Sequence, residues 1–230
     1  MNKQTNKPAP FIGISRHRLA TDGVGVTTLA AFWGCPLRCA YCLNPHSLSV
    51  DAKVQHYTPQ ELYDAVKIDN LYFAATGGGI TFGGGEPCLY PDFIAKFREM
   101  CGAEWTITME TSLNVPFENI EKLVSVVDYW IVDCKDLNPE TYEKYTKKSN
   151  LHTITNLKFL IEQGKSKKIR VRVPRIENYN TETDIETSVS TLHEMGLTDI
   201  EIFTYNITRK KNIRESKLMG DNNANRIKCV

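Results

Sequence analysis

Three cysteines stand close together in the run Gly34-Cys-Pro-Leu-Arg-Cys-Ala-Tyr-Cys-Leu-Asn44, directly after an apolar segment with the character of a strand. Cys35, Cys39 and Cys42 are spaced so that one loop can wrap three thiolates around a corner of a cubane iron–sulfur cluster. A [4Fe–4S] cluster with three protein ligands leaves one iron open, where a small molecule can bind and be reduced. The spacing therefore favours redox chemistry on a bound small molecule.

A zinc site is the main alternative, and three buried thiols are a second. Zinc sites usually have four ligands in two pairs, and this chain has no second pair. His46 is the only histidine close to the three cysteines. The remaining cysteines stand singly, at Cys88, Cys101, Cys134 and Cys229. The three cysteines alone favour a cluster and leave both alternatives open.

The isolated cysteines are expected to be structural. Free cysteines are commonly small buried hydrophobes, which is the prediction for Cys88 and Cys101. Cys134 follows Asp133 directly, so it should point to the opposite side of the strand and pack outside the barrel. Cys229 has no potential ligand partner nearby.

The composition fits one domain in a reducing compartment. The chain has 230 residues and a formal net charge of +1, which gives no electrostatic reason to expect nucleic acid or an anionic membrane as a partner. Seven cysteines without a signal peptide suggest metal chemistry in the cytoplasm and not a disulfide framework. No apolar run approaches membrane-spanning length. The basic residues at 165–172 and 209–211 lack interleaved aromatics and are expected to be solvated.

Short apolar segments alternate with amphipathic ones along most of the chain. The apolar segments predict strands buried on both faces, at residues 27–33, 80–82, 105–109, 129–132, 169–173 and 200–204. The amphipathic segments predict helices at residues 59–66, 91–100, 117–126, 139–146, 152–163 and 183–195. Thr58 and Glu61 form a capping box that opens the first of these helices.

Strands that alternate with helices predict a parallel sheet with right-handed crossovers. Six repeats are too few for a closed eight-unit barrel, so we expect an α/β fold with an open (β/α)6 barrel, or a doubly wound sheet. The predicted organisation is a flexible N-terminus at 1–10, one barrel domain at 11–206 and a polar tail at 207–230. In either fold the chemistry belongs at the carboxyl ends of the strands.

Polar and glycine residues do follow the ends of the predicted strands, and they should converge on one mouth. In chain order they are Cys35, the run Gly83-Gly84-Gly85-Glu86, Glu110, the pair Asp133 and Lys135, Arg172 in the fifth strand, and Asn206. Glycines at 83–85 would let a ligand approach the backbone closely. The run is not a phosphate-binding loop, because no Gly-Lys-Ser/Thr follows it.

Three stretches together resemble the radical S-adenosylmethionine (radical SAM) superfamily. They are Asp22-Gly-Val-Gly25, the cysteine run continued from Phe32 to Pro45, and Gly77-Gly-Gly-Ile-Thr-Phe-Gly-Gly-Gly-Glu-Pro87. Within the superfamily the chain is most similar to the activating enzymes of glycyl radical enzymes, of the pyruvate formate-lyase activase type. The similarity runs in order from about residue 11 to about residue 206, and C-x₃-C-x₂-C followed by Gly-Gly-Glu-Pro is a strong joint signal.

The resemblance implies a role for each matching residue. Cys35, Cys39 and Cys42 would hold one [4Fe–4S] cluster, and Tyr41 would pack near the adenine of S-adenosylmethionine. The methionyl amine and carboxylate would bind the open iron. Further contacts to this cofactor are implied for Asn44, Gly84, Gly85, Glu86, Glu110, Asp133, Lys135, Arg172 and Asn206. The Asp-x-Lys at 133–135 also matches the place of the family's monovalent-cation contacts.

The resemblance also implies the reaction and the partners. One electron enters the cluster, the sulfonium breaks into methionine and a 5′-deoxyadenosyl radical, and that radical takes a hydrogen atom from the substrate. In activases the substrate is a backbone glycine of a large partner, a glycyl radical enzyme, and the electron donor is a flavodoxin or ferredoxin. An incomplete barrel suits this substrate because its side opening can admit a polypeptide.

Several positions depart from the activase pattern. Leu43 and Asn206 stand where histidines are usual, Glu110 replaces an aspartate, and Val24 replaces a proline. Thr27 stands where an arginine is usual. Residues 43–75 contain no cysteine, so the ferredoxin-like insert of longer activases is absent and one cluster is expected. Two other functions stay open: a single-cluster radical SAM enzyme for a small molecule or peptide, and a non-catalytic iron–sulfur or zinc protein.

Overall fold

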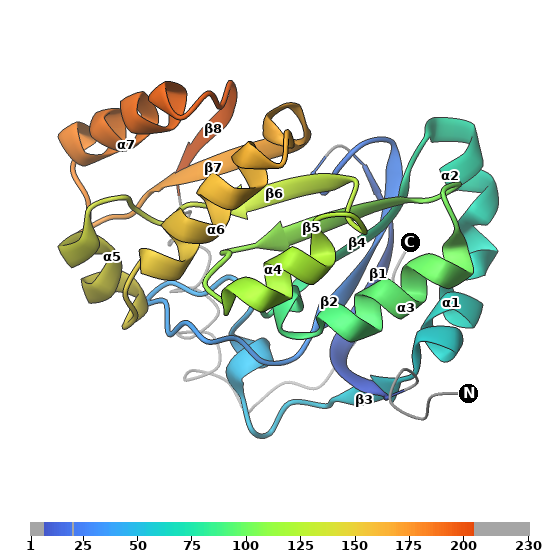
Figure 1. The fold of residues 1–230 in the computed structure, drawn as a ribbon. Coiled ribbons are helices and arrows are strands. Elements are labelled where there is room, and N and C mark those ends of the chain that lie inside the picture. Colours follow the sequence, from blue (N-terminus) through green and yellow to red (C-terminus); the bar gives the residue numbers. More distant parts are fainter. Residues whose placement is uncertain (1–6, 20, 205–230) are drawn as a thin grey trace, which may run out of the picture.

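The computed structural model describes residues 7–19 and 21–204. One sheet of eight strands runs through it in the order β3-β1-β2-β4-β5-β6-β7-β8 (Figure 1). Six neighbouring strands pair in parallel, in the order β2, β4, β5, β6, β7 and β8. On the other side of β2, the sheet is extended by β1, which is antiparallel to β2, and by β3, which is antiparallel to β1. The predicted partial (β/α)6 barrel is therefore confirmed.

Every predicted strand has a counterpart among the parallel strands. These are β2 (Val26–Phe32), β4 (Gly79–Gly84), β5 (Thr106–Thr111), β6 (Tyr129–Asp133), β7 (Ile169–Arg175) and β8 (Asp199–Thr204). Each is a parallel neighbour of the next, so their carboxyl ends lie at one edge of the sheet. That edge positions the candidate site.

The two antiparallel strands, β1 (Ala9–Leu19) and β3 (Gln55–Tyr57), were not predicted. The second half of β1 is the polar run from Arg16 to Arg18, and its pairing with β2 is interrupted by two register shifts. This strand therefore lacks the regular alternation that indicates a strand. It begins at Ala9, which is buried, so the last residues of the expected flexible segment 1–10 are in the sheet.

The helices follow the predicted alternation and add one short helix. Their bounds are α1 (Pro59–Val66), α2 (Asn70–Thr76), α3 (Pro91–Cys101), α4 (Phe117–Leu123), α5 (Pro139–Thr146), α6 (Leu151–Glu162) and α7 (Glu182–Glu194). The capping box of Thr58 and Glu61 is present at the start of α1. The helix α2 was not predicted. It is capped at its C-terminus by Gly77, whose φ of 69° lies in the left-handed region that favours glycine.

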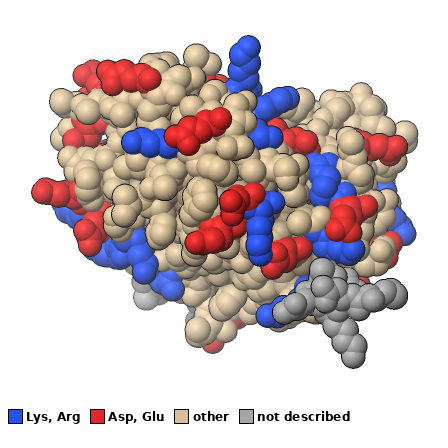
Figure 2. All heavy atoms as spheres, in the orientation of Figure 1, with Lys and Arg blue, Asp and Glu red and all other residues tan. Residues whose placement is uncertain are grey.

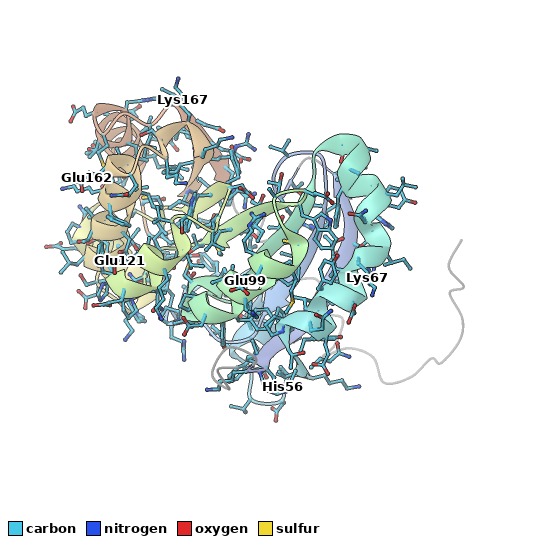
Figure 3. The ribbon with its side chains drawn as sticks, turned by 45° about the vertical axis from the view of Figure 1, so that its right-hand side comes forward. His56, Lys67, Glu99, Glu121, Glu162 and Lys167 are labelled. Carbon is cyan, nitrogen blue, oxygen red and sulfur yellow. The ribbon has the colours of Figure 1, made fainter. Side chains whose placement is uncertain are left out.

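The helices lie along one face of the sheet, with α3, α4 and α6 in front of it in Figure 1. Apolar side chains of the strands that face them form the main core, and they include Ala30, Phe32, Ile80, Phe82, Ile107, Met109, Trp130, Val132, Val171 and Val173. On the solvent side of the layer, Glu99, Glu121 and Glu162 project from α3, α4 and α6 (Figure 3). The helical layer is thus apolar inside and charged outside.

The other face of the sheet, which is the inner face of the open barrel, is largely polar. Alternate residues of the same strands point there, and they include Thr81, Thr108, Glu110, Asp133, Arg170, Arg172 and Glu201. The Arg170 side chain is 34% exposed and that of Glu201 is 49% exposed. The prediction that every strand is buried on both faces is therefore wrong for β7 and β8, because the open barrel leaves their inner face accessible.

Surface charge is mixed in sign over the helical face, where acidic and basic side chains alternate (Figure 2). Lys167 lies in the short 3-10 turn Ser166–Lys168 and points into solvent, as predicted for the basic run (Figure 3). The arginines of that run behave differently: Arg170 pairs with Asp199, and Arg172 pairs with Glu110. Among the described residues, no helix is long and apolar enough to cross a membrane.

Candidate functional site

The cysteine loop after β2 and the glycine loop after β4 pack directly against each other. The backbone N–H groups of Gly85 and Glu86 donate to the carbonyls of Phe32 and Gly34, at 2.9 and 2.8 Å. A Cβ at Gly85 would lie 2.1 Å from the Gly34 carbonyl oxygen, and one at Gly84 would lie 2.7 Å from the Ala31 Cβ. Glycine is therefore required at both positions for the close approach of the two loops.

These loops and the ends of β5 and β6 enclose one pocket. The sequence prediction included the lining residues Cys35, Cys39, Tyr41, Cys42, Asn44, Gly84, Gly85, Glu86, Glu110, Asp133 and Lys135. The pocket is also lined by Leu37, Leu43, Thr111 and Ser112, which were not among the predicted cofactor contacts, although Thr111 and Ser112 follow the third predicted strand. Arg172 is not in the lining and lies behind Glu110, while Asn206 lies outside the described residues.

The cysteine loop is fixed by contacts with α5 and with the glycine loop. The backbone N–H groups of Arg38 and Ala40 donate to the carbonyls of Thr146 and Tyr145, at 2.8 and 3.1 Å. On the other side, the Asn44 side-chain amide donates to the Gly84 carbonyl at 3.1 Å. The loop therefore has a defined position at the mouth of the barrel.

Aromatic side chains pack against the cysteine loop at Cys39 and Tyr41. The ring centroid of Tyr41 lies 5.8 Å from that of Tyr179 and 6.3 Å from that of Tyr145. Cys39 packs against the same small cluster, whose buried members are Tyr145 and Ile176. Tyr41 thus presents a fixed aromatic surface beside the cysteines, which suits stacking with a planar ring.

The surroundings of Cys35 and Cys39 disfavour the deprotonated, thiolate form of these side chains. Burial raises the pKa of Cys35 to about 12, and the Glu86 carboxylate adds to the shift. Burial also raises the pKa of Cys39, against the effect of the nearby Lys135 ammonium. A thiolate here needs a positive partner such as a metal centre.

The donor set at the pocket fits a cluster with three protein ligands. Three thiols line this pocket, whereas Cys88, Cys101 and Cys134 are buried in the main core, as predicted. In the part of the chain that the structure describes, no three His, Cys, Asp or Glu side chains are gathered tightly enough to form a metal-binding group. The three thiols share one pocket, and among residues 7–19 and 21–204 no fourth cysteine or histidine lines it.

Glu86 is buried, and its carboxylate accepts four hydrogen bonds from the chain. The donors are the hydroxyl groups of Thr111 and Ser112, both at 2.6 Å, and the backbone N–H groups of Ser112 and Cys88, at 2.9 and 3.2 Å. Three of the contacts cross from the glycine loop to the end of β5. The carboxylate thus ties the glycine loop to the neighbouring strand, a role that the sequence alone did not reveal.

Four charged side chains form a network at the pocket, where all but Arg172 are in the lining. Glu110 pairs with Arg172 at 2.5 Å, and Asp133 pairs with Lys135 at 2.8 Å. Burial raises the pKa of Glu110, the Asp133 carboxylate adds to the rise, and the Arg172 guanidinium opposes it. The network combines residues from the third, fourth and fifth parallel strands or their ends, as the sequence predicted.

Comparison with known proteins identifies the family. The model of the radical SAM superfamily matches residues 32–204. A (2S)-3-sulfopropanediol dehydratase activating enzyme from Klebsiella oxytoca is 30% identical, over 76% of this chain and 74% of its own. A pyruvate formate-lyase-activating enzyme from Listeria monocytogenes is 32% identical, over 75% of this chain and 70% of its own.

Solved structures agree on the fold. QueE from Escherichia coli superposes with a TM-score of 0.55 at 13% identity, covering 92% of this chain and 90% of its own. A domain of a pyruvate-formate lyase-activating enzyme from Bacteroides vulgatus has a TM-score of 0.50 at 22% identity, over 60% of this chain and 92% of its own.

The chain therefore belongs to the radical SAM superfamily, whose members carry a [4Fe–4S] cluster and S-adenosylmethionine. Within the superfamily its relatives place it among the activating enzymes of glycyl radical enzymes. The recognition made from the sequence motifs is confirmed, and the reading as a radical SAM enzyme is supported over a zinc site or a non-catalytic protein.

Proposed function

We propose that this chain generates a glycyl radical in a partner enzyme. The observation that carries the proposal is the pocket where the cysteine loop meets Gly84 and Gly85, at the carboxyl ends of the strands of an open barrel. Ligand chemistry in parallel α/β folds belongs at this edge. The similarity to activating enzymes supports a protein as the substrate.

The lining residues have roles that follow from their chemistry. Cys35, Cys39 and Cys42 would hold the cluster, with one iron left open for S-adenosylmethionine. When bound, the cluster supplies the electron that splits this cofactor into methionine and a 5′-deoxyadenosyl radical, which removes a hydrogen atom from a glycine. Tyr41 would pack on the adenine, since it is the aromatic ring in the lining.

The polar residues would bind and orient the methionyl group. The backbone of Gly84 and Gly85 borders the pocket and offers carbonyl oxygens to an ammonium group. Lys135, which also lines the pocket, would attract the methionyl carboxylate. Asp133 keeps one buried carboxylate oxygen, Oδ1, without a hydrogen-bond partner, which a donor on the ligand would satisfy.

Two predicted cofactor contacts are better described as positioning residues. The Glu86 carboxylate is occupied by four donors of this chain, so we assign it to holding the glycine loop. Arg172 lies outside the lining and contacts Glu110, so we assign it to holding that carboxylate. Asn206 remains a predicted contact from the sequence alone.

The expected partners are a glycyl radical enzyme and an electron donor of the flavodoxin or ferredoxin type. The rim of the pocket includes Leu43, which is 63% exposed and available for contact with an incoming polypeptide. The reaction on a small molecule or peptide is the second candidate, since the same pocket would serve it. A monovalent cation at the Asp-x-Lys segment of Asp133 and Lys135 stays a prediction from the sequence.

The test is electron paramagnetic resonance on the anaerobically reconstituted protein, incubated with S-adenosylmethionine, a reductant and a candidate glycyl radical enzyme. We expect the doublet of a glycyl radical, and none when the partner's radical-bearing glycine is replaced by alanine. Cleavage of S-adenosylmethionine without a doublet in any candidate partner would favour the small-molecule alternative.

A further inference from the structure

Basic side chains gather where the cysteine loop meets the C-terminal end of α5. The backbone N–H of Arg38 donates to the carbonyl of Thr146 at 2.8 Å, so Arg38 lies beside the last turn of α5 and the residues that follow it. Nζ of Lys147 folds back on this turn and donates to the carbonyl of Lys144 at 3.0 Å. The basic residues at this place are Arg38, Lys144, Lys147 and Lys148, which we call the basic rim.

The positive charges of the basic rim are available to a partner. All four residues are exposed, and among residues 7–19 and 21–204 none of the four forms an ion pair. Exposed lysines elsewhere on the surface are neutralised, as Lys67 is by Asp64. A partner with carboxylates would therefore not have to displace an ion pair of this chain to reach the basic rim.

Acidic residues on the adjoining segments only partly offset this charge. They are Glu140 and Glu143 of α5 and Glu177, two residues before Tyr179. Four positive charges against these three negative ones leave a surplus of +1, which equals the net charge of the whole chain. The rest of the protein therefore sums to zero, and the surplus of positive charge belongs to this area.

The cysteine loop forms a wall between the basic rim and the pocket. Leu37 and Cys39 line the pocket, whereas Arg38, which stands between them, does not. On the outer side of the loop, Nη1 of Arg38 donates to the carbonyls of Cys35 and Leu37, at 2.7 and 2.8 Å. The N–H groups on Nε and Nη2 of the guanidinium remain available for a partner.

Lys144 is joined to the same wall through aromatic rings. Its Nζ lies 5.5 Å from the ring centroid of Tyr179, a distance typical of a cation–π contact. The Tyr179 ring packs in turn on Tyr41 of the pocket lining, with their centroids 5.8 Å apart. The basic rim thus contacts the wall of the pocket at Arg38 and at Lys144 without occupying the pocket.

This position favours one kind of partner. A glycine that loses a hydrogen atom must enter the pocket, whereas an electron donor need only bring its redox centre close to the cluster from outside. Each cleavage of S-adenosylmethionine consumes one electron, so a donor must dock within reach of the cysteine loop. A donor on the basic rim would leave the pocket open to the substrate protein, and carboxylates around its redox centre would complement the rim.

We propose that the basic rim is the docking surface for a small electron-transfer protein whose redox centre is surrounded by carboxylates. The docked partner is oxidised by one electron, and the cluster behind the cysteine loop is reduced by the same electron. The inference rests on the proposed function in taking the pocket as the site of the cluster.

The first test measures binding of flavodoxin, as the probe, to the reconstituted protein by isothermal titration calorimetry at low ionic strength. The double variant Lys147→Glu with Lys148→Glu reverses two charges of the basic rim and should bind about tenfold or more weakly. Lys167→Glu with Lys168→Glu is the matched control, because it reverses two neighbouring exposed lysines in the turn Ser166–Lys168. Its affinity should stay within about twofold of the unmodified protein, whose own affinity should fall as NaCl is added.

The second test follows reduction of the cluster by its loss of visible absorbance. With limiting amounts of fully reduced flavodoxin, reduction should be about tenfold slower in the basic-rim variant and unchanged in the control. Dithionite is a small reductant that needs no docking surface, so it should reduce the cluster to the same extent in both variants. Carbodiimide cross-linking of the unmodified complex should join carboxylates of flavodoxin to Lys144, Lys147 or Lys148.

The outcomes that would overturn the inference are specific. Equal weakening in the two double variants, or none in the basic-rim variant, would contradict it. Loss of affinity for a glycyl radical enzyme, with flavodoxin binding retained, would assign this surface to the substrate protein instead. If the basic-rim variant does not fold, the cross-links decide, and links confined to lysines outside the basic rim would overturn the inference.

Failure of this inference can be told apart from failure of the proposed function. A glycyl radical in the partner, together with normal flavodoxin coupling in both double variants, would overturn the inference and leave the proposed function standing. Selective loss of flavodoxin coupling in the basic-rim variant, without a glycyl radical in any partner, would do the reverse.

Discussion

The two faces of the sheet are formed by the same strands but differ in polarity and in function. Facing the helices, β5 and β6 present Met109, Trp130 and Val132, which are all fully buried in the main core. Facing the barrel interior, the same strands present Glu110 and Asp133, which carry charge at the pocket. One face stabilises the fold and the other binds. A mutation moved by one position along a strand therefore changes from one that affects stability to one that affects the chemistry of the pocket.

The largest effect that separates the two regions is expected at the cysteine loop. Cys39→Ala should remove nearly all cluster iron and its absorbance, because two thiolates cannot hold the cubane. Cys101→Ala is the matched control, since Cys101 is buried at the end of α3 in the main core. Iron analysis after anaerobic reconstitution measures both. Similar iron content in the two variants would contradict the assignment of the ligands.

The next effect concerns the helical face. Trp130→Ala should lower the free energy of unfolding by about 3–5 kcal/mol, because it leaves a cavity in a fully packed core. Arg170→Ala, on the inner face of β7, should cost only about 0–1 kcal/mol, since its pair with Asp199 is partly exposed. Urea unfolding of the protein without its cluster tests both. Equal losses of unfolding free energy in the two variants would contradict the distinction between the two faces of the sheet.

A smaller effect is expected where the two regions join, at Glu86. Glu86→Gln replaces an acceptor oxygen with a donor amide opposite groups that already donate, which should cost about 1–3 kcal/mol of stability. It should also weaken S-adenosylmethionine binding, because the glycine loop loses its tie to β5. Glu118→Gln, exposed in the first turn of α4, is the control and should leave both quantities unchanged. Unchanged stability and unchanged S-adenosylmethionine affinity in Glu86→Gln would mean that the glycine loop is held by its backbone contacts alone.

The smallest effect lies on the outer side of the helical layer. The backbone N–H and hydroxyl of Thr181 hold the pKa of Asp184 below its ordinary value in the capping box of α7. A carboxyl with a lowered folded pKa stabilises above its unfolded pKa, and this stabilisation is lost as the pH falls through the folded pKa. Asp184→Asn should therefore lower the melting temperature slightly at neutral pH, and the difference should vanish at an acidic pH below the lowered pKa of Asp184.

The control for that helix is Glu186→Gln, an exposed change two residues further along α7. It should leave the melting temperature unchanged at both pH values. A pH-independent loss in Asp184→Asn would instead indicate that the side chain matters for packing and not as a cap. Neither variant should alter cluster content, because α7 does not border the pocket.

Much of this arrangement could be predicted from the sequence, because short motifs mark the ends of the strands. Gly84 and Gly85 could be placed at the pocket from their position after an apolar run, and Asp133 and Lys135 likewise. The strand β1 could not be predicted, since its register shifts and its charged second half remove the two-residue period. A local pattern records the alternation of a strand but not a bulge in it.

The roles within the site were harder to predict than its membership. The assignment of Arg172 and Glu86 to the cofactor stays a prediction, and the sequence did not show that Arg172 contacts Glu110 or that the Glu86 carboxylate accepts from Thr111, Ser112 and Cys88. These contacts join strands that are far apart in the sequence, and no spacing rule encodes them. The open inner face of β7 and β8 was missed for the same reason, since exposure depends on how far the barrel closes.

The most direct measurement of the central claim is product analysis after reduction of the reconstituted protein with dithionite in the presence of S-adenosylmethionine. The account predicts methionine and 5′-deoxyadenosine in equal amounts, formed by the unmodified protein and by Cys101→Ala but not by Cys39→Ala. A protein that retains its iron and forms neither product would contradict the account, because the cysteine loop would then hold a centre without this chemistry.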